Sequence, residues 1–236
     1  MSLKAVLFDL DGTLLPMDQD VFIKAYFKGI TAKLAPYGYK PEELVNAIWQ
    51  GTGAMIKNDG SKTNEEAFWG VMVKIFGEKC LEDTTYFDKF YEENFDELKA
   101  VCGYNPKSAE VIDMLKNADI RRILATNPVF PCIATEKRIN FAGLKPTDFE
   151  FITSYENIGF AKPNPGYYKE ILKRADLKAE DCLMVGNDVS DDMVAEKLGM
   201  KVFLLTDCIV NKYNKDISVY PNGDFDALVQ YIKEIM

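Results

Sequence analysis

Short apolar segments that end in polar residues alternate along this chain with segments of helical periodicity. The apolar segments are predicted as buried strands and cover residues 3–11, 121–127, 182–188, 201–207 and, more weakly, 149–155. Helical patterns lie between or after them, at 106–118, 165–175 and 224–235. Asn164 followed by Pro165 is typical of a helix start. Strands that alternate with helices predict a doubly wound, Rossmann-like α/β core with a parallel sheet.

One gap between the predicted strands is too long for this simple pattern. The first strand ends near Asp11 and the next convincing one begins near Arg121, whereas a single crossover needs about 30 residues. Helical patterns fill the gap, at 20–35, 41–50, 64–77 and 85–99. We therefore predict a helical domain at 17–95, inserted into a core formed by residues 1–16 and 96–236.

Aromatic residues are frequent in the predicted helical domain. They occupy positions 22, 26, 27, 49, 68, 69, 76, 86, 87, 90 and 91. They are either the core of a small helical bundle or a cage around a ligand, and we favour the core because aromatic side chains bury large areas. The glycine-rich, polar stretch 49–66 is predicted as a loop between two helices. It either connects them or reaches the ligand-binding edge of the sheet.

The chain contains no histidine among its 236 residues. This excludes Ser-His-Asp triads, Cys-His pairs, histidine metal clusters and phosphohistidine chemistry, so acid–base steps fall to carboxylates, Lys, Tyr or Cys. A metal site would be rich in oxygen ligands, which favours Mg²⁺ or Ca²⁺. The net charge of −9 argues against nucleic acids and anionic membranes as partners. It would also repel an anionic substrate unless a bound metal reverses the local charge.

Three further features concern the location of the protein. No apolar run reaches the roughly 18–20 residues that a membrane span needs, and the chain opens directly into a strand without a leader pattern. Five cysteines, an odd number without a CxxC pair, are typical of reduced thiols. We expect a cytoplasmic protein, either a monomer or a homodimer.

Polar side chains gather where the predicted strands end, which is where open parallel sheets bind their ligands. If Asp9 and Asp11 continue the first strand, alternation places both carboxylates on one face, where they repel each other unless a cation or a shared proton intervenes. The other candidates at this edge are Thr126, Asn127, Lys162, Asn187, Asp188, Asp191 and Asp192. Each alone has an ordinary structural explanation, such as helix capping, but their joint placement predicts a site.

Four motifs, in this order, resemble those of the haloacid dehalogenase-like (HAD) hydrolase superfamily. They are DLDGT at 9–13, LATN at 124–127, AKPNP at 161–165 and GNDVSDD at 186–192. The helical insertion between the first two resembles the α-helical cap of members such as haloacid dehalogenases, phosphoglycolate phosphatase and β-phosphoglucomutase. The resemblance implies a Mg²⁺-dependent phosphatase that hydrolyses a small phosphorylated metabolite through an aspartyl-phosphate.

The resemblance also implies roles for individual residues. Asp9 would be the nucleophile, and Asp11 would protonate the leaving oxygen and then deprotonate the attacking water. Lys162 would balance charge between the phosphoryl group and Asp9. The implied phosphate-binding groups are Thr126, Asn127, Lys162 and backbone N–H groups around Leu10 and Gly12.

The same resemblance implies a Mg²⁺ site formed by the Asp9 carboxylate, the Asp11 backbone carbonyl and the Asp188 carboxylate. Many relatives have Asp directly after the glycine, where this chain has Asn187. The choice of ligand in this motif therefore stays open. Three further residues of this motif are Asn187, Asp191 and Asp192. Each would either bind the metal, directly or through a water, or lie behind its ligands.

Four alternatives to a phosphatase differ in what they require. The dehalogenases of the superfamily lack the second aspartate and use no metal, because a carbon–halogen bond needs no leaving-group proton, so Asp11 favours phosphoryl transfer. A sugar-phosphate mutase of the same fold would share every motif. Receiver domains also phosphorylate an aspartate, but they are about half this length and carry it after a later strand. A catalytically silent binding protein is disfavoured by the four intact motifs.

Overall fold

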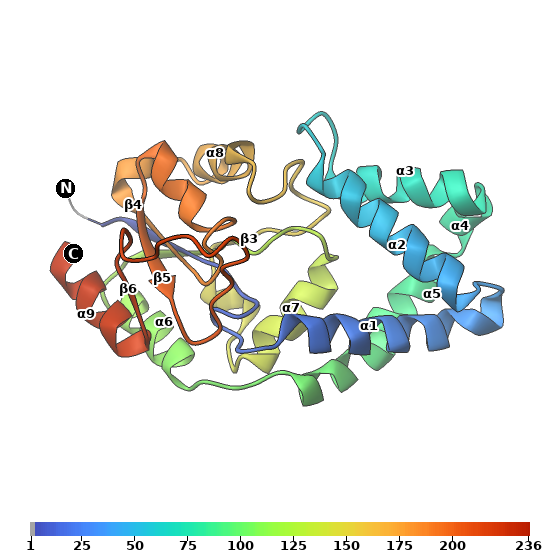
Figure 1. The fold of residues 1–236 in the computed structure, drawn as a ribbon, viewed down its shortest axis with the longest axis horizontal. Coiled ribbons are helices and arrows are strands. Elements are labelled where there is room, and N and C mark those ends of the chain that lie inside the picture. The colour runs from blue at the N-terminus through green and yellow to red at the C-terminus, as the bar shows by residue number, and fades with distance from the viewer. Residues whose placement is uncertain (1–2) are drawn as a thin grey trace.

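The computed structural model describes residues 3–236, which fold around a parallel sheet (Figure 1). Within these residues the sheet has the order β3-β2-β1-β4-β5-β6, and all neighbouring strands run parallel. The strands are Ala5–Phe8 (β1), Arg121–Leu124 (β2), Phe151–Ile152 (β3), Cys182–Gly186 (β4), Lys201–Leu205 (β5) and Asn222–Gly223 (β6). The five predicted strands are confirmed, and β6 is an additional short one that no apolar run predicts.

Helices cover both faces of the sheet. They are α6 (Lys107–Asn117), α7 (Cys132–Phe141), α8 (Pro165–Arg174), α9 (Phe225–Ile235) and the short 3-10 helix Met193–Leu198. Val6 and Phe8 of β1 share an apolar cluster with α6 and α9, whereas Ala5 and Leu7 share another with α8 and the 3-10 helix. The predicted doubly wound α/β class is therefore confirmed. Helix α7 is absent from the sequence-based expectations.

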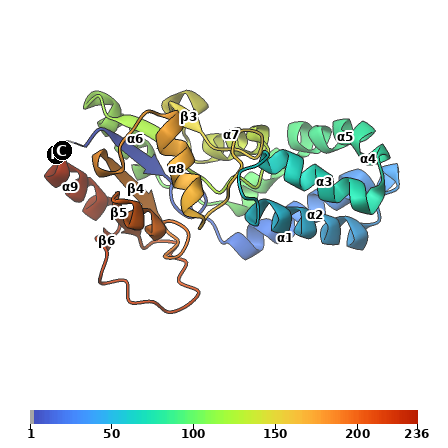
Figure 2. The same ribbon diagram turned by 90° about the horizontal axis from the view of Figure 1, so that it is seen from above.

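The helices between β1 and α6 lie together beyond one end of the sheet (Figures 1 and 2). We call them the helical group, residues 19–101. They are α1 (Gln19–Leu34), α2 (Pro41–Ile56), α3 (Asn64–Phe76), α4 (Lys79–Glu82), α5 (Thr84–Lys89), a π-helical segment at Phe90–Asn94 and a 3-10 helix at Phe95–Val101, with one further 3-10 turn at Ala35–Tyr37. The predicted helical content of this part of the chain is confirmed.

Two chain segments connect the helical group to the rest of the molecule, and they run side by side. Met17 and Cys102 form an antiparallel bridge, and the Gly103 N–H donates to the Pro16 carbonyl at 2.6 Å. The apolar cluster on the α6 and α9 face continues into the group, where the Phe95 ring stacks on Phe141 of α7. We keep the division into a core and an inserted domain at 17–95 as a proposal.

The predicted loop at 49–66 is wrong in its first half, because α2 continues to Ile56. Gly51 lies in α2 where the Phe68 ring of α3 packs against the helix backbone, and a Cβ there would come within 2.5 Å of that ring. Its glycine marks a close approach of two helices rather than a loop. The connection is limited to residues 57–63.

The predicted aromatic core is confirmed in part. Phe22, Tyr26 and Phe90 are buried, whereas Trp49 is 50% exposed. No helix within residues 3–236 combines the length and apolarity needed to cross a bilayer.

Candidate active site

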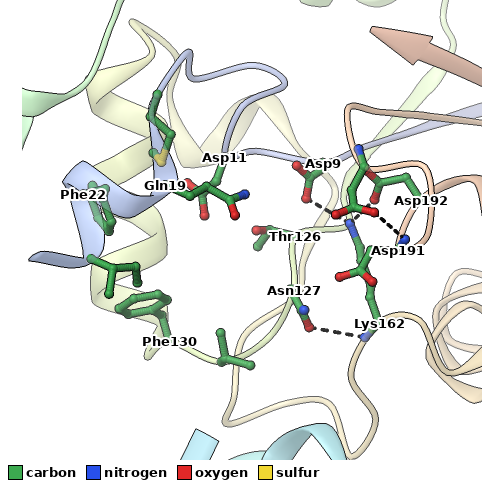
Figure 3. A pocket seen from close by; sticks show the side chains of 14 residues that line it. Asp9, Asp11, Gln19, Phe22, Thr126, Asn127, Phe130, Lys162, Asp191 and Asp192 are labelled. Atoms are coloured by element: carbon green, nitrogen blue, oxygen red, sulfur yellow. Dashed lines mark hydrogen bonds and ion pairs between the residues drawn. The ribbon is translucent and has the colours of Figure 1, made fainter. Parts of the chain in front are cut away.

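A cavity of about 190 Å³ opens at the carboxyl ends of β1, β2 and β4 (Figure 3). The predicted site residues that line it are Asp9, Asp11, Thr126, Asn127, Lys162, Asp188, Asp191 and Asp192. Leu10, Gly12 and Asn187 are not among its lining residues. Figure 3 shows Asp9, Lys162 and Asp192 on one side of Thr126, with Phe22 and Phe130 on the other. The cavity therefore has a charged end and an apolar end.

Lys162 joins two carboxylates at the charged end. Its Nζ lies 2.9 Å from Asp9 Oδ1 and 2.6 Å from Asp192 Oδ1, and all three side chains are buried. Burial alone would lower the pKa of Lys162, but the charges of Asp192 and Asp9 raise it well above its ordinary value. The amine therefore stays protonated and holds the Asp9 carboxylate in a fixed position.

The second oxygen of Asp9 is held from behind by a small polar network. The Thr13 hydroxyl lies 3.1 Å from Asp9 Oδ2 and 3.2 Å from Asn187 Oδ1. Asn187 Nδ2 in turn donates to the Cys208 carbonyl at 2.6 Å. Asn187 thus lies behind Asp9 as part of its support.

Gly12 turns the chain sharply after Asp11. Its φ of +85° lies in the left-handed region, and a Cβ at this position would clash with the Asn187 amide. The Gly12 N–H donates to the Leu15 carbonyl at 2.8 Å. This corrects the expectation that it is free to bind phosphate, because the turn already uses it.

Asp9 and Asp11 do not share a strand face, contrary to the expectation from alternation. Strand β1 ends at Phe8, and the turn that follows is closed by the Leu15 N–H, which donates to the Leu10 carbonyl at 2.9 Å. In the view of Figure 3 Asp9 points toward Lys162, whereas Asp11 lies on the other side of Thr126. The turn thereby gives each aspartate its own surroundings.

Asp11 pairs with Arg138 of α7, a residue that the sequence-based expectations missed. The Arg138 guanidinium contacts Asp11 Oδ2, donates to Thr135 Oγ1 at 3.2 Å and lies 4.6 Å from the centre of the Phe130 ring. Arg138 is only 1% exposed. The basic residue belongs to an unpredicted helix, so no local signal links it to Asp11.

The Asp11 carboxyl is suited to holding a proton. Its Oδ1 is buried and has no hydrogen-bond partner among residues 3–236. Burial raises the pKa of Asp11, Arg138 opposes this, and the nearby charge of Asp9 adds to it, so the pKa lies above its ordinary value. A carboxyl group with a raised pKa can serve as an acid near neutral pH.

Thr126 and Asn127 follow β2 and are fixed by neighbouring segments. Asn127 Oδ1 accepts from the Lys162 N–H at 3.2 Å, which leaves its Nδ2 as the donor available to a ligand. The Thr126 carbonyl accepts from Thr153 Oγ1 and from the Tyr167 hydroxyl, each at 2.7 Å. These bonds hold the chain so that the Thr126 side chain lines the cavity.

The segment after β4 supplies most of the negative charge. Asp188 Oδ1 accepts from the N–H groups of Ser190 and Asp191 at 2.7 and 2.9 Å, which closes the turn. Burial and the charge of Asp188 raise the pKa of Asp191 to about 6. Among the described residues that line the cavity are five aspartates and a single lysine. This excess of carboxylate oxygens suits a hard divalent cation.

These residues fit Mg²⁺ in particular. No three His, Cys, Asp or Glu side chains converge as a closed metal cage in the described part of the chain. Mg²⁺ does not require one, since it keeps several waters and is usually bound by one or two carboxylates together with substrate phosphate. Asp9 and Asp188 both line the cavity and supply carboxylates of this kind.

Asn64, the first residue of α3, ties the helical group to the site. It is fully buried, and its Nδ2 donates to the carbonyls of Pro128 and Phe160, both at 3.1 Å. Its Oδ1 accepts from Asn58 Nδ2 at 2.9 Å. Pro128 directly follows Asn127, and Phe160 lies two residues before Lys162. The end of the predicted 49–66 loop therefore contacts the segments that carry the site.

Known proteins resemble this chain in sequence and in fold. A family model described as haloacid dehalogenase-like hydrolase matches residues 3–199. The pyrophosphatase PpaX of Bacillus velezensis is 26% identical over 197 residues, which cover 84% of this chain and 80% of that protein. A phosphoglycolate phosphatase of Aquifex aeolicus is 24% identical over 202 residues, covering 86% and 84%. A solved 2-haloacid dehalogenase from Pseudomonas syringae pv. Tomato DC3000 has a TM-score of 0.64 at 19% identity, covering 98% and 99%, and shares the fold.

Proposed function

Because the chain belongs to the haloacid dehalogenase-like hydrolases, we propose that it is a Mg²⁺-dependent phosphatase of a small phosphorylated metabolite. Membership confirms the predicted family and the hydrolase class. The relatives named for pyrophosphate and phosphoglycolate support a small phosphorylated substrate. The observation that carries the proposal is the Asp9 carboxylate, held by Lys162 at 2.9 Å at the charged end of the cavity, with Asp11 at the same cavity.

In the first proposed step Asp9 attacks phosphorus in line with the leaving oxygen. The new bond joins a carboxylate oxygen to phosphorus, the bond from phosphorus to the leaving oxygen breaks, and Asp11 gives that oxygen its proton. Carboxylates are weak nucleophiles, so the fixed position of Asp9 is essential. The product alcohol then leaves an aspartyl-phosphate behind.

In the second step a water molecule attacks the same phosphorus. Asp11, now a carboxylate, takes a proton from the water, and the bond from phosphorus to the Asp9 oxygen breaks. Phosphate leaves and both aspartates return to their starting states. Arg138 stabilises the Asp11 carboxylate between the two steps, because its guanidinium already contacts that side chain.

The remaining predicted groups bind the phosphoryl oxygens. Lys162, Thr126 and the free Nδ2 of Asn127 present donors to the charged end, together with the backbone N–H of Leu10. Mg²⁺, when held by the Asp9 carboxylate, the Asp11 carbonyl and Asp188, would neutralise the phosphoryl charge. Asp191 and Asp192 lie beside these ligands, and Lys162 balances Asp9 and Asp192.

Asp11 with Arg138 also favours a phosphatase over a dehalogenase. A carboxyl group with a raised pKa supplies a leaving-group proton, which cleavage of a carbon–halogen bond does not need. A mutase would use the same residues, with a sugar hydroxyl in place of water. A cytoplasmic location and a monomeric or homodimeric state complete the proposal.

The test is a panel of phosphate esters assayed with Mg²⁺ for release of inorganic phosphate. The panel should hold sugar phosphates, nucleotides, phosphoglycolate and pyrophosphate, with sugar-phosphate isomers followed in parallel. We expect phosphate release from at least one small ester. Hydrolysis of none would contradict the proposal, and isomer interconversion without net phosphate release would identify a mutase.

A further inference from the structure

A second cavity, of about 150 Å³, lies between the helical group and the segments at 129–131 and 155 that follow β2 and β3. Aromatic side chains from α1, α2, α3 and the segment after α5 line most of it, among them Tyr26, Trp49, Trp69 and Tyr91. Several of them are aromatic positions for which the sequence favoured a helical-bundle core over a ligand cage. The structure gives them a space to surround.

The second cavity adjoins the active site. Three side chains, Ile23, Val129 and Phe130, line both cavities. Phe130 belongs to the apolar end of the active-site cavity, across from Asp9 and Lys162 (Figure 3). A molecule with its phosphoryl group at Asp9 therefore points its other end toward these side chains and the space behind them.

The chemistry of the second cavity is apolar. None of the described residues that line it carries a charge. Three of its polar side chains are already hydrogen-bonded, since the Tyr26 and Tyr91 hydroxyls are 2.9 Å apart and Thr52 Oγ1 donates to the Ile48 carbonyl at 2.9 Å. A carboxylate or a second phosphate placed there would lose much of its hydration and find no cationic side chain among the described lining residues. An engineered apolar cavity of about 150 Å³ binds benzene, so this cavity is large enough for a ring of that size.

We propose that the substrate carries an apolar leaving group of about the size of a benzene ring, which occupies the second cavity while Asp9 receives the phosphoryl group. This inference rests on the proposed phosphatase function and names its substrate class: a monoester of an apolar alcohol. It separates this chain from the relatives named for phosphoglycolate and pyrophosphate, since both of those compounds carry a second anionic group.

The first test compares kcat/KM for benzyl phosphate, ethyl phosphate and phosphoglycolate with Mg²⁺. Benzyl and ethyl phosphate both release a primary alcohol, so their difference reports mainly the ring. We expect benzyl phosphate to exceed both others by about tenfold or more, because burial of a phenyl-sized group is strongly favourable. Equal or better turnover of ethyl phosphate or phosphoglycolate would overturn the inference and leave the phosphatase proposal intact.

The second test fills the cavity. Thr52→Phe places a ring where Thr52 lines it, and we expect kcat/KM for benzyl phosphate to fall about tenfold or more, with little change for ethyl phosphate. Thr31→Phe is the matched control. Thr31 also donates to the carbonyl four residues earlier on its helix, at 2.6 Å to Phe27, but it lines neither cavity. If kcat/KM for benzyl phosphate fell equally in both variants, the second cavity would not be the binding site of the ring.

The third test needs no catalysis. The chain has two tryptophans, and both line the second cavity. Benzyl alcohol should change tryptophan emission in a saturable way in the wild type and not in Thr52→Phe, with each variant's fold checked by circular dichroism. An unchanged wild-type emission would overturn the inference. If no ester in the series is hydrolysed but benzyl alcohol binds, the phosphatase proposal fails and the apolar site stands.

Discussion

The guanidinium of Arg138 and the carboxylate of Asp11 form an ion pair between α7 and the turn after β1. The two partners differ in exposure, since the Arg138 side chain is 1% exposed and that of Asp11 is 21% exposed. Loss of one partner leaves the other without its counter-charge. The penalty should depend on which one remains, because a partly exposed charge can regain water and a buried one cannot.

We therefore expect Asp11→Asn to lower the free energy of unfolding by about 3 kcal/mol, because it leaves the Arg138 charge buried and unpaired. Arg138→Met should lower the free energy of unfolding by less, about 1 kcal/mol, since the Asp11 carboxyl, whose pKa is raised, can take up a proton when its counter-charge is lost, which a guanidinium cannot do by releasing one. Urea denaturation of both variants without added metal measures the difference. The reverse ranking would show that Asp11 is the more deeply buried partner in solution.

Asp9→Asn should abolish turnover, with kcat reduced by about 10³-fold or more, because a carboxamide cannot form an acyl phosphate with the substrate. Lys162 keeps Asp192 as a partner at 2.6 Å, so the fold should survive. Steady-state kinetics with a hydrolysed ester, next to a thermal melt, gives both quantities. Activity above a few per cent of wild type would exclude Asp9 as the nucleophile.

Removal of divalent cations should abolish phosphate release. Five aspartates and one lysine line the cavity, so without a cation its charge would repel an anionic phosphoryl group. EDTA treatment followed by dialysis should leave no measurable phosphate release, and added Mg²⁺ should restore it. Ca²⁺ is the matched control, since its larger and looser coordination suits in-line transfer poorly. Full turnover in metal-free buffer would contradict the proposed site.

Gly12→Ala should lower the free energy of unfolding by about 2 kcal/mol, because φ is +85° and the new Cβ meets the Asn187 amide behind Asp9. Activity should fall as well, since Asn187 supports Thr13 and Asp9. Gly53→Ala in α2 is the control: open space surrounds it, so it should stabilise by about 0.5 kcal/mol. Chemical denaturation and kcat should be measured for both variants. If Gly12→Ala kept the wild-type stability and kcat, the turn would not require glycine at this position.

Asn64→Ala should lower the free energy of unfolding by about 3 kcal/mol, because the carbonyls of Pro128 and Phe160 lose the donor that buried Asn64 supplies. Asn46→Ala, at an exposed position of α2, should stay within about 0.5 kcal/mol of wild type. Thermal and urea unfolding measure both. If the two asparagines behaved alike, the bonds of Asn64 to the core would be absent in solution.

The strands and most helices could be predicted because they depend on local patterns. Apolar runs such as AVLF in β1 identify the sheet, and the polar residues that follow the strands gave Asp9 and, beyond the weaker strand, Lys162 as candidates for one site. Strand β6 could not be predicted, because its two residues form no apolar run and its pairing with β5 is a tertiary contact. The prediction of a loop at 49–66 relied on glycines such as Gly51. This glycine instead lets the Phe68 ring pack closely against α2.

The pairing of Asp11 with Arg138 could not be predicted for a different reason. The two residues are 127 positions apart, and α7 lacks a cap signal or a clear apolar stripe. Alternation also misplaced Asp11, because β1 ends one residue before Asp9. Backbone hydrogen bonds of the turn, which no residue pattern reports, decided the direction of the side chain.

Asn64 also bears on how substrate reaches the site. Two covalent crossings, at Met17 and Cys102, lie side by side and alone would form a hinge axis. The buried bonds of Asn64 add a third point of attachment, and Figure 1 places the start of α3 away from those crossings. A body fixed at three points cannot swing about two of them. We therefore expect the helical group to open only after the Asn64 hydrogen bonds break, which makes opening slower than the nanosecond rotamer changes of exposed side chains.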